Sequence, residues 1–231
     1  CHKDGMSIIE NGPEAGRTLK SYLDEAGPAV LGEHAQKFPY FPLLIKLIDA
    51  KDNLSVQVHP DNDYAMRVEG EYGKTEMWYI VDCEPGATLI YGFKHAISKE
   101  EFEKRIADNT LLEVCNQVPV HKGDVFFIAS GTLHAICKGI IICEIQQNSN
   151  TTYRVYDYGR VGKDGKSREL HVKKAIDVTN LEPVQKRLHL DAAIDIFADT
   201  EARLLASCEY FTVYELEIDG TSHLTAGEDS F

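Results

Sequence analysis

The fold of this chain can be predicted from the stretch Leu54-Ser55-Val56-Gln57-Val58-His59-Pro60-Asp61. Apolar and polar side chains alternate over its first five residues, which is the period of a half-buried β-strand. Residues two apart in a strand point to the same face, so we expect Gln57 and His59 to project side by side. Pro60 has no N–H to donate to a neighbouring strand, and we therefore expect the strand to end there.

Two later segments bring further polar side chains to the ends of predicted strands. Lys74-Thr75-Glu76 leads into an apolar, aromatic-rich run that is typical of a strand. Burying Glu76 beside Trp78 would be costly unless a partner balanced its charge. Residues 123–134 contain another apolar run, a glycine turn and then His134. If these strands share one barrel, an amide, a carboxylate and two imidazoles can converge, which is a ligand set suited to Zn²⁺ or a similar divalent ion.

Composition excludes several classes of protein. The chain has 231 residues, 43% of them hydrophobic and 26% charged, which is ordinary for a globular protein with a real core. Its formal net charge of −13 argues against a nucleic-acid-binding surface but not against a small anionic substrate. No apolar run approaches the roughly 20 residues of a membrane helix. Six scattered cysteines without a C-x-x-C pair favour free thiols, and we expect a cytoplasmic protein.

Many short predicted strands and few predicted helices point to a jelly roll or a similar β barrel with its helices outside. We expect strands over residues 43–49, 54–59, 76–81, 88–91, 118–128 (interrupted by a turn at Gly123-Asp124), 139–147 and 151–158. We expect helices over residues 18–26, 98–108, 111–116 and 170–175, and a polar loop over 61–73. Because the composition changes near residue 187 and alternation returns over 208–218, we predict one domain over residues 1–188 and the start of a smaller β domain over 189–231. A chain that begins at Cys1 and ends in a β-like region is expected to be a fragment.

Some of these residues have an ordinary structural interpretation. Lys46 interrupts the apolar run 43–49, and it is either an edge residue whose ammonium reaches water or a residue of the pocket. Arg154, taken alone, is more often part of a structural ion pair on a strand than of a catalytic site. No single residue therefore decides the function, and the argument depends on the combination.

The combination resembles a known family. Residues 123–134 are similar to the second cupin motif, with Ala129 where proline is usual. The order Gln-x-His-Pro-Asp, Lys-Thr-Glu, Ser-Gly-Thr-x-His-Ala and Gln-Gln-Asn-Ser, running into Thr-Tyr-Arg-Val-Tyr-Asp-Tyr, resembles the type I mannose-6-phosphate isomerases in their short bacterial form over about residues 43–160. This resemblance implies a mainly β protein: a cupin jelly-roll barrel with a few peripheral helices, which forms the catalytic domain, and a second, smaller β domain.

The resemblance also implies the residues of the site. It assigns one Zn²⁺ per chain to four ligands: Gln57, His59, Glu76 and His134. It places the essential arginine of the family at Arg154, its pocket glutamate at Glu144 and its active-site lysine at Lys74. Two positions depart from the family pattern: Asn150 stands where aspartate is usual, and Arg160 stands where lysine is frequent. The second change keeps the positive charge, whereas the first removes a carboxylate that could anchor a loop.

The function implied is the interconversion of mannose 6-phosphate and fructose 6-phosphate through an enediolate. Zn²⁺ would act as a Lewis acid, and Arg154 would stabilise the enediolate or hold an oxyanion. The general base is Glu144 or Lys74, and the sequence does not choose between them. We expect the substrate phosphate to meet Arg154, Arg160 or another basic residue at the pocket mouth, and the protein to be a monomer or a weak homodimer.

Two other functions compete with the isomerase. The first is a non-catalytic cupin module that binds or senses a sugar phosphate, but a mere binder has no need of Lys74, Glu144 and Arg154 beside the ligands. The second is a cupin oxygenase that uses Fe²⁺. Such sites usually have more histidines near the first motif, where this chain has Gln57.

Overall fold

The computed structural model describes residues 5–38, 40–162, 164–184 and 201–223 of the chain. The chain divides into two compact units, one formed by residues 1–44 and 190–231 and the other by residues 45–189. The predicted domain boundary between residues 188 and 189 lies outside the described residues and stays a prediction. The described cysteines, Cys83, Cys115, Cys137, Cys143 and Cys208, are free thiols.

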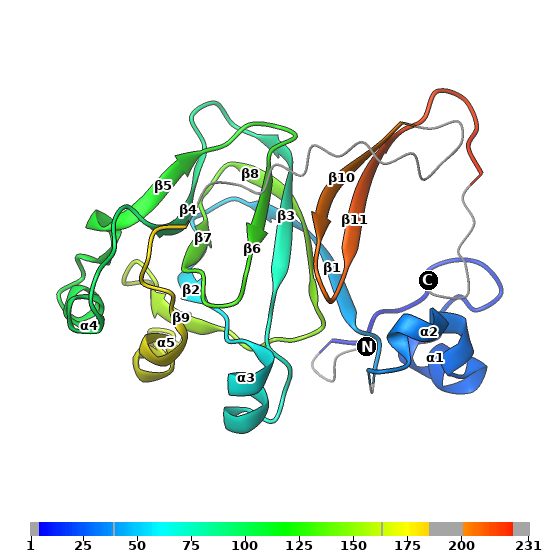
Figure 1. Cartoon of the computed structure of the whole chain (residues 1–231), viewed down its shortest axis with the longest axis horizontal. Coiled ribbons are helices and arrows are strands. Elements are labelled where there is room, and N and C mark those ends of the chain that lie inside the picture. Colours follow the sequence, from blue (N-terminus) through cyan, green and yellow to red (C-terminus); the bar gives the residue numbers. More distant parts are fainter. Residues whose placement is uncertain (1–4, 39, 163, 185–200, 224–231) are drawn as a thin grey trace. The chain divides into compact units, whose positions relative to one another are not determined.

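Two sheets form the larger unit (Figure 1). The four-stranded sheet has the order β1 (Leu43–Ala50), β8 (Ile140–Gln147), β3 (Glu76–Cys83) and β6 (Val125–Ile128). The five-stranded sheet has the order β5 (Cys115–Pro119), β4 (Thr88–Phe93), β7 (His134–Ile136), β2 (Val56–Val58) and β9 (Tyr153–Tyr156). Strand β3 pairs antiparallel with β6 and β8, and β2 pairs antiparallel with β7 and β9.

The core between the sheets consists of alternate residues from both of them. Its members that are at most 4% exposed include Trp78, Ile80, Leu89, Phe126, Ile136 and Ile142. Each such side chain contributes about 1.5–3 kcal/mol when it is fully buried. Strand β1 shows the same two-residue alternation, because Ile45 and Leu47 are exposed while Lys46 and Ile48 face inward. This alternation places polar residues at defined positions on the inner face of the barrel.

Helices cover the outside of the five-stranded sheet. Phe102 and Ile106 of α4 (Lys99–Ala107) and Ala175 of α5 (Val172–Val178) pack in one cluster with residues of β2 and β9. Helix α5 lies beside β9 (Figure 1). Helix α4 begins at Ser98, whose Oγ accepts a hydrogen bond from the Glu101 N–H at 3.1 Å, as its capping pattern predicts. Among the described residues, no helix is long and apolar enough to cross a membrane.

Two predictions of secondary structure in this unit are wrong. The segment 61–73 is not a loop throughout, because α3 (Asn62–Val68) follows Asp61, whose side chain accepts from the Tyr64 N–H at 2.8 Å. Aspartate at this position satisfies a free N–H of the first turn. The predicted helix 111–116 is a 3₁₀ turn over Leu111–Glu113, and β5 already begins at Cys115.

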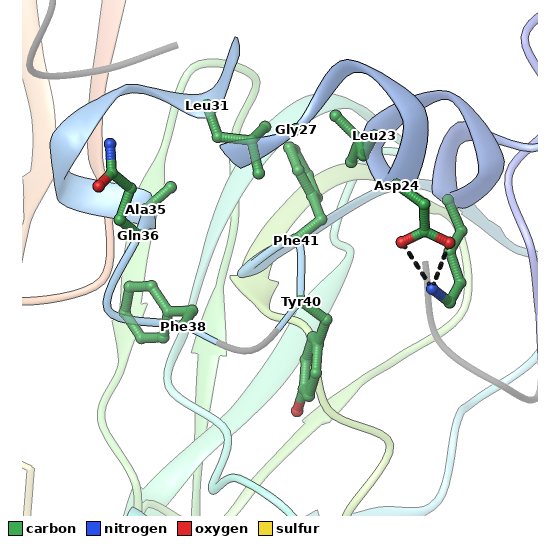
Figure 2. Close-up of a pocket in the computed structure, with 10 residues that line it drawn as sticks. Leu23, Asp24, Gly27, Leu31, Ala35, Gln36, Phe38, Tyr40 and Phe41 are labelled. Atoms are coloured by element: carbon green, nitrogen blue, oxygen red, sulfur yellow. Dashed lines mark hydrogen bonds and ion pairs between the residues drawn. The ribbon is translucent and has the colours of Figure 1, made fainter. Parts of the chain in front are cut away.

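The smaller unit contains α1 (Leu19–Ala26), a 3₁₀ turn (Pro28–Leu31), α2 (Gly32–Ala35) and the antiparallel hairpin of β10 (Glu201–Ser207) and β11 (Thr212–Glu217). Thr18 caps α1 by accepting from the Ser21 N–H, and Gly27 ends it with a φ of 81°, a backbone conformation that favours glycine. A pocket of this unit is lined by Leu23, Leu31, Phe38 and Phe41, with the ion pair of Lys20 and Asp24 at its edge (Figure 2). The predicted site residues do not line it.

Candidate active site

Strands of both sheets bring three buried side chains together. His59 directly follows β2, Glu76 begins β3 and His134 begins β7. Their ligand atoms all lie within 4.8 Å of one another, and each residue is at most 1% exposed. Gln57 joins them because it lies directly opposite His134 in the β2–β7 pairing. The structure therefore places all four predicted metal ligands at one point of the barrel.

Backbone carbonyls orient both histidines toward Glu76. Nδ1 of His59 lies 2.9 Å from the Thr151 carbonyl, and Nδ1 of His134 lies 2.8 Å from the Thr132 carbonyl. A carbonyl can only accept, so each Nδ1 carries the proton and donates it, which leaves the Nε2 of each ring unprotonated and able to accept a hydrogen bond or bind a cation. The His59 Nε2 is 3.7 Å from Glu76 Oε2, and the His134 Nε2 is 3.4 Å from Oε1. Metal-binding histidines have this arrangement, with a backbone acceptor fixing the ring.

Burial keeps both rings neutral. Burial, with a contribution from the charge of Lys74, lowers the pKa of His59 from 6.5 to about 4. Burial also lowers the pKa of His134 below its ordinary value. Because only an unprotonated imidazole can bind a metal ion, these directions favour metal binding at neutral pH.

Glu76 is an anion without adequate hydrogen bonds. Neither of its carboxylate oxygens accepts a well-oriented hydrogen bond from the described residues, although Lys74 Nζ lies 2.7 Å from Oε2. Burial opposes ionisation, but Lys74 and the two histidines hold the pKa of Glu76 well below its ordinary value. A divalent cation would supply what these buried oxygens lack. Two imidazoles, a carboxylate and an amide therefore fit Zn²⁺ or a similar ion.

The Gln57 amide completes this group after one rotation. Its Nε2 lies 3.4 Å from the His134 Nε2, and its Oε1 lies 3.5 Å from Ser55 Oγ. The two ends of a glutamine amide have nearly the same shape, so a half-turn would direct the oxygen to the histidines. Ser55 is two residues before Gln57, just as Gln57 is two residues before His59, so all three side chains point to the same face of the strand. Strand alternation would therefore have found Ser55, which our reading of the sequence did not single out.

Lys74 lies against the predicted metal ligands. Its Nζ is 3.1 Å from His59 Nε2, 2.7 Å from Glu76 Oε2 and 3.9 Å from Glu144 Oε1. Burial alone would lower the pKa of Lys74, but Glu76 and Glu144 raise it above its ordinary value. In this arrangement the amine is charged, so a role as base requires a further change in its surroundings. Gly73 allows the close approach of this segment, because a Cβ there would lie 2.4–2.6 Å from the backbone of residues 60–62.

Glu144 lies next to Lys74 and is held by two donors. Trp78 Nε1 donates to its Oε2 and Lys46 Nζ donates to its Oε1, each at 3.0 Å. Lys46 Nζ also donates to Gln146 Oε1 at 2.6 Å. The side chain of Lys46 is 36% exposed and that of Glu144 only 5%. Lys46 combines the two roles considered from the sequence: it lies on the edge strand β1 with a partly exposed side chain, and its ammonium binds Glu144 and Gln146.

Arg154 reaches the site from β9, where it lies opposite Gln57. Its Nε donates to Ser55 Oγ at 3.3 Å and its Nη1 donates to the Glu169 carbonyl at 3.0 Å. Burial and the charge of Arg168 lower its pKa, yet an arginine keeps its charge in proteins. In the part of the chain that the structure describes, this guanidinium bonds to neutral oxygens. The structural ion pair considered from the sequence is absent there.

Arg160 and Asn150 have other surroundings. Arg160 donates to the Asn53 carbonyl at 2.6 Å and to the carboxylate of Asp157. Asp157 is buried and also binds Arg168. Neither Asp157 nor Arg168 was recognised from the sequence, and no local spacing would have paired them. Asn150 is exposed.

Comparison with known proteins shows which family this chain resembles. Residues 1–82 match the family model of the phosphomannose isomerase type I catalytic domain. A probable mannose-6-phosphate isomerase of Bacillus subtilis is 44% identical over 221 residues, which are 95% of this chain and 68% of that protein. A mannose-6-phosphate isomerase of Streptococcus mutans is 43% identical over 226 residues, covering 96% of this chain and 68% of its own length.

This chain belongs to the type I phosphomannose isomerase family.

A solved structure of the mannose 6-phosphate isomerase of Bacillus subtilis agrees with this assignment. It has a TM-score of 0.84 and 39% identity, and the match covers 95% of this chain and 68% of that one. The family, the enzyme class and the mainly β fold class predicted from the sequence are therefore confirmed. Of the residues assigned through the resemblance, the structure groups Gln57, His59, Glu76 and His134, with Lys74, Glu144 and Arg154 around them.

Proposed function

We propose that this phosphomannose isomerase interconverts mannose 6-phosphate and fructose 6-phosphate with one bound Zn²⁺ and through an enediolate. The observation that carries the proposal is the buried cluster of His59, Glu76 and His134, in which the Nε2 atoms of the two rings lie 3.7 and 3.4 Å from a fully buried carboxylate that is paired with Lys74. Family membership and the names of the relatives support the reaction and the substrate. A cytoplasmic location and a monomeric or weakly dimeric state stay predictions.

His59, Glu76, His134 and the amide oxygen of Gln57 would hold the ion. When bound, a divalent ion supplies a Lewis acid that polarises the substrate carbonyl. The chain contributes the rest of the environment. Its two histidines are fixed by backbone carbonyls, so they need no reorganisation when the ion enters.

The reaction moves one proton between C1 and C2 of the sugar, and a second proton between the two oxygens. Lys74 Nζ and Glu144 Oε1 are 3.9 Å apart and are the groups that can accept and return these protons. Lys46 and Trp78 fix the orientation of the Glu144 carboxylate. The residues thus provide a basic group and a donor side by side, which a sensor module would not require.

Basic side chains favour an anion on the Arg154 side of the site. Three guanidinium groups, those of Arg154, Arg160 and Arg168, interact with the single carboxylate of Asp157, so positive charge is in excess there. A guanidinium is planar and can hold two oxygens of a phosphate or of an enediolate. We infer that the phosphate group enters on this side and that Arg154 stabilises the charge that develops on the sugar oxygens.

A coupled assay of fructose 6-phosphate formation from mannose 6-phosphate tests the proposal. Activity should disappear with a chelator and return with Zn²⁺. His134→Ala should lose metal and activity together, whereas Arg154→Ala should keep its metal content while kcat falls by at least about 100-fold. His121→Ala is the matched control, because this imidazole is 83% exposed and should affect neither property. Binding of sugar phosphates without turnover by the folded, zinc-loaded protein would instead favour the sensor function.

A further inference from the structure

Arg168 belongs to none of the motifs that define the site, yet it makes a two-point contact close to it. Its Nε donates to Asp157 Oδ2 at 2.8 Å, and its Nη2 donates to Oδ1. Asp157 directly follows β9 and is only 7% exposed. A bidentate pair of this kind fixes both distance and orientation. The hydrogen bond from Arg168 is the main reason that the pKa of Asp157 is lowered.

The residues that follow Arg168 lie along β9 and contact Arg154. The His171 N–H donates to the Arg154 carbonyl at 2.8 Å, and the Arg154 N–H donates to His171 Nδ1 at 3.2 Å. The Glu169 carbonyl accepts from Arg154 Nη1 at 3.0 Å. The guanidinium of Arg154 therefore rests on a backbone carbonyl that is one residue from Arg168.

His171 is held by its two hydrogen bonds with Arg154 and by α5, which begins at Val172, but the residues before it have few such contacts. Residues 164–170 are all exposed, so the hydrophobic core does not fix them. The preceding loop contains Gly159, Gly162 and Gly165 and closes on itself through the bridge of Val161 with Ser167. The Asp157 carboxylate ties the segment to the end of β9, which is the strand that carries Arg154.

We propose that Arg168 is a positioning residue for Arg154: its pair with Asp157 holds residues 168–171 against β9, and the Glu169 carbonyl then orients the Arg154 guanidinium. The inference rests on the proposed function, in which Arg154 stabilises charge on the substrate. Arg168 does not touch the reacting atoms in this role. Its loss would displace a charged group that must be aligned with the enediolate, and small misplacements of such groups are costly.

A double-mutant cycle tests the coupling. Arg168→Ala and Arg168→Lys are each made in the wild-type chain and in Arg154→Lys, and steady-state kinetics are measured on zinc-loaded protein. In the wild-type chain, Arg168→Ala should lower kcat by about 10- to 100-fold with KM changed by less than about 3-fold. Arg168→Lys should recover part of kcat, because one ammonium replaces one of the two bonds. In the Arg154→Lys background, Arg168→Ala should lower kcat by less than about 3-fold.

Two further measurements separate positioning from a loss of structure. The Nε–H NMR signal of Arg154 can be assigned by its absence in Arg154→Lys, and it should change its chemical shift in Arg168→Ala. The metal content and the thermal midpoint of Arg168→Ala should stay near wild type, because the Arg168 side chain is 50% exposed. Arg105→Ala is the matched control. It removes an arginine that pairs with Glu101 and Glu113, and it should change neither kcat nor the Arg154 signal.

The outcomes are distinct. Equal losses of kcat in both backgrounds, or an unchanged Arg154 signal, would overturn the proposal. An increase in KM with kcat unchanged would also overturn it and would make Arg168 a direct phosphate contact. If the wild-type enzyme itself shows no turnover, the proposed function fails, and the NMR comparison still decides whether Arg168 orients Arg154.

Discussion

The stability of the metal-free protein should depend steeply on pH, because His59 is buried in its neutral form. Its pKa falls from 6.5 to about 4 in the folded chain, mainly through burial and then through the charge of Lys74. Below pH 6.5 the unfolded chain therefore binds a proton that the folded chain does not bind. The free energy of unfolding must fall as the pH drops from about 6.5 toward about 4, and the loss then levels off.

The size of this loss follows from the two pKa values. One unit of pKa difference corresponds to about 1.4 kcal/mol, so His59 accounts for about 3 kcal/mol in total and roughly 2 kcal/mol by pH 5. His134 adds to the loss because burial lowers its pKa as well. Glu76 contributes little above pH 5, because its ordinary pKa of 4.5 in the unfolded chain and its lowered pKa in the folded chain both lie below that pH.

Urea unfolding of the chelator-treated protein at pH 7, 6 and 5 measures the effect. Trp78 is the single tryptophan of the chain, and its ring lies 5.3 Å from the His134 ring, so its fluorescence reports on the site. His59→Gln should flatten the pH dependence because it removes the titrating group. His121→Gln, at a position that is 83% exposed, should keep the wild-type dependence. A flat wild-type profile, or equal slopes in wild type and His59→Gln, would refute the reasoning.

Two further predictions test how the barrel supports the site. Gly131→Ala and Gly123→Ala place a side chain at the same φ of 85°, which costs about 1 kcal/mol of unfolding free energy. Only Gly131→Ala also brings a Cβ to 2.9 Å from the Val178 carbonyl, so urea unfolding should show an additional loss of about 1–2 kcal/mol; equal losses would contradict this. Trp78→Phe removes the 3.0 Å hydrogen bond to Glu144 and should lower kcat by about 10-fold with metal content unchanged, and an unaltered kcat would show that this bond does not orient the carboxylate.

The sequence predicted the grouping of the site because strand geometry is local. Alternation over β2 placed Gln57 and His59 on one face, and Glu76 and His134 were expected at strand ends of the same barrel. The structure shows this convergence within 4.8 Å for His59, Glu76 and His134. Their role as metal ligands stays a prediction. The grouping could be predicted because each residue lies in or next to an apolar run that forms a strand. Side chains alternate between the two faces of a strand, so the face to which each residue points follows from its position in the run.

Local sequence patterns gave wrong predictions for two short segments, residues 61–73 and 111–116. Helix α3 (Asn62–Val68) lies in the segment predicted as a loop, and it is too short to show a clear helical repeat of apolar residues. Its only strong signal is Asp61, which caps it, but aspartate is equally common in turns. At residues 111–116 the first turn is 3₁₀, and pairing with β4 then draws Cys115 into the sheet. Tertiary pairing overrides helix propensity at this point.

The surroundings of Arg154 show a different limit of sequence-based prediction. A resemblance can assign Arg154 a role, but the groups that orient it come from residues 168–171, at the far end of a glycine-rich loop. A loop of this kind has no periodic pattern from which its path could be predicted. The contact between Arg168 and Asp157 depends on that path, because the two residues are eleven positions apart and only the returning loop brings them together. The grouping of side chains at strand ends, such as the proposed metal ligands, can therefore be predicted before the structure is known, whereas contacts to Arg154 that come from a loop require the structure itself.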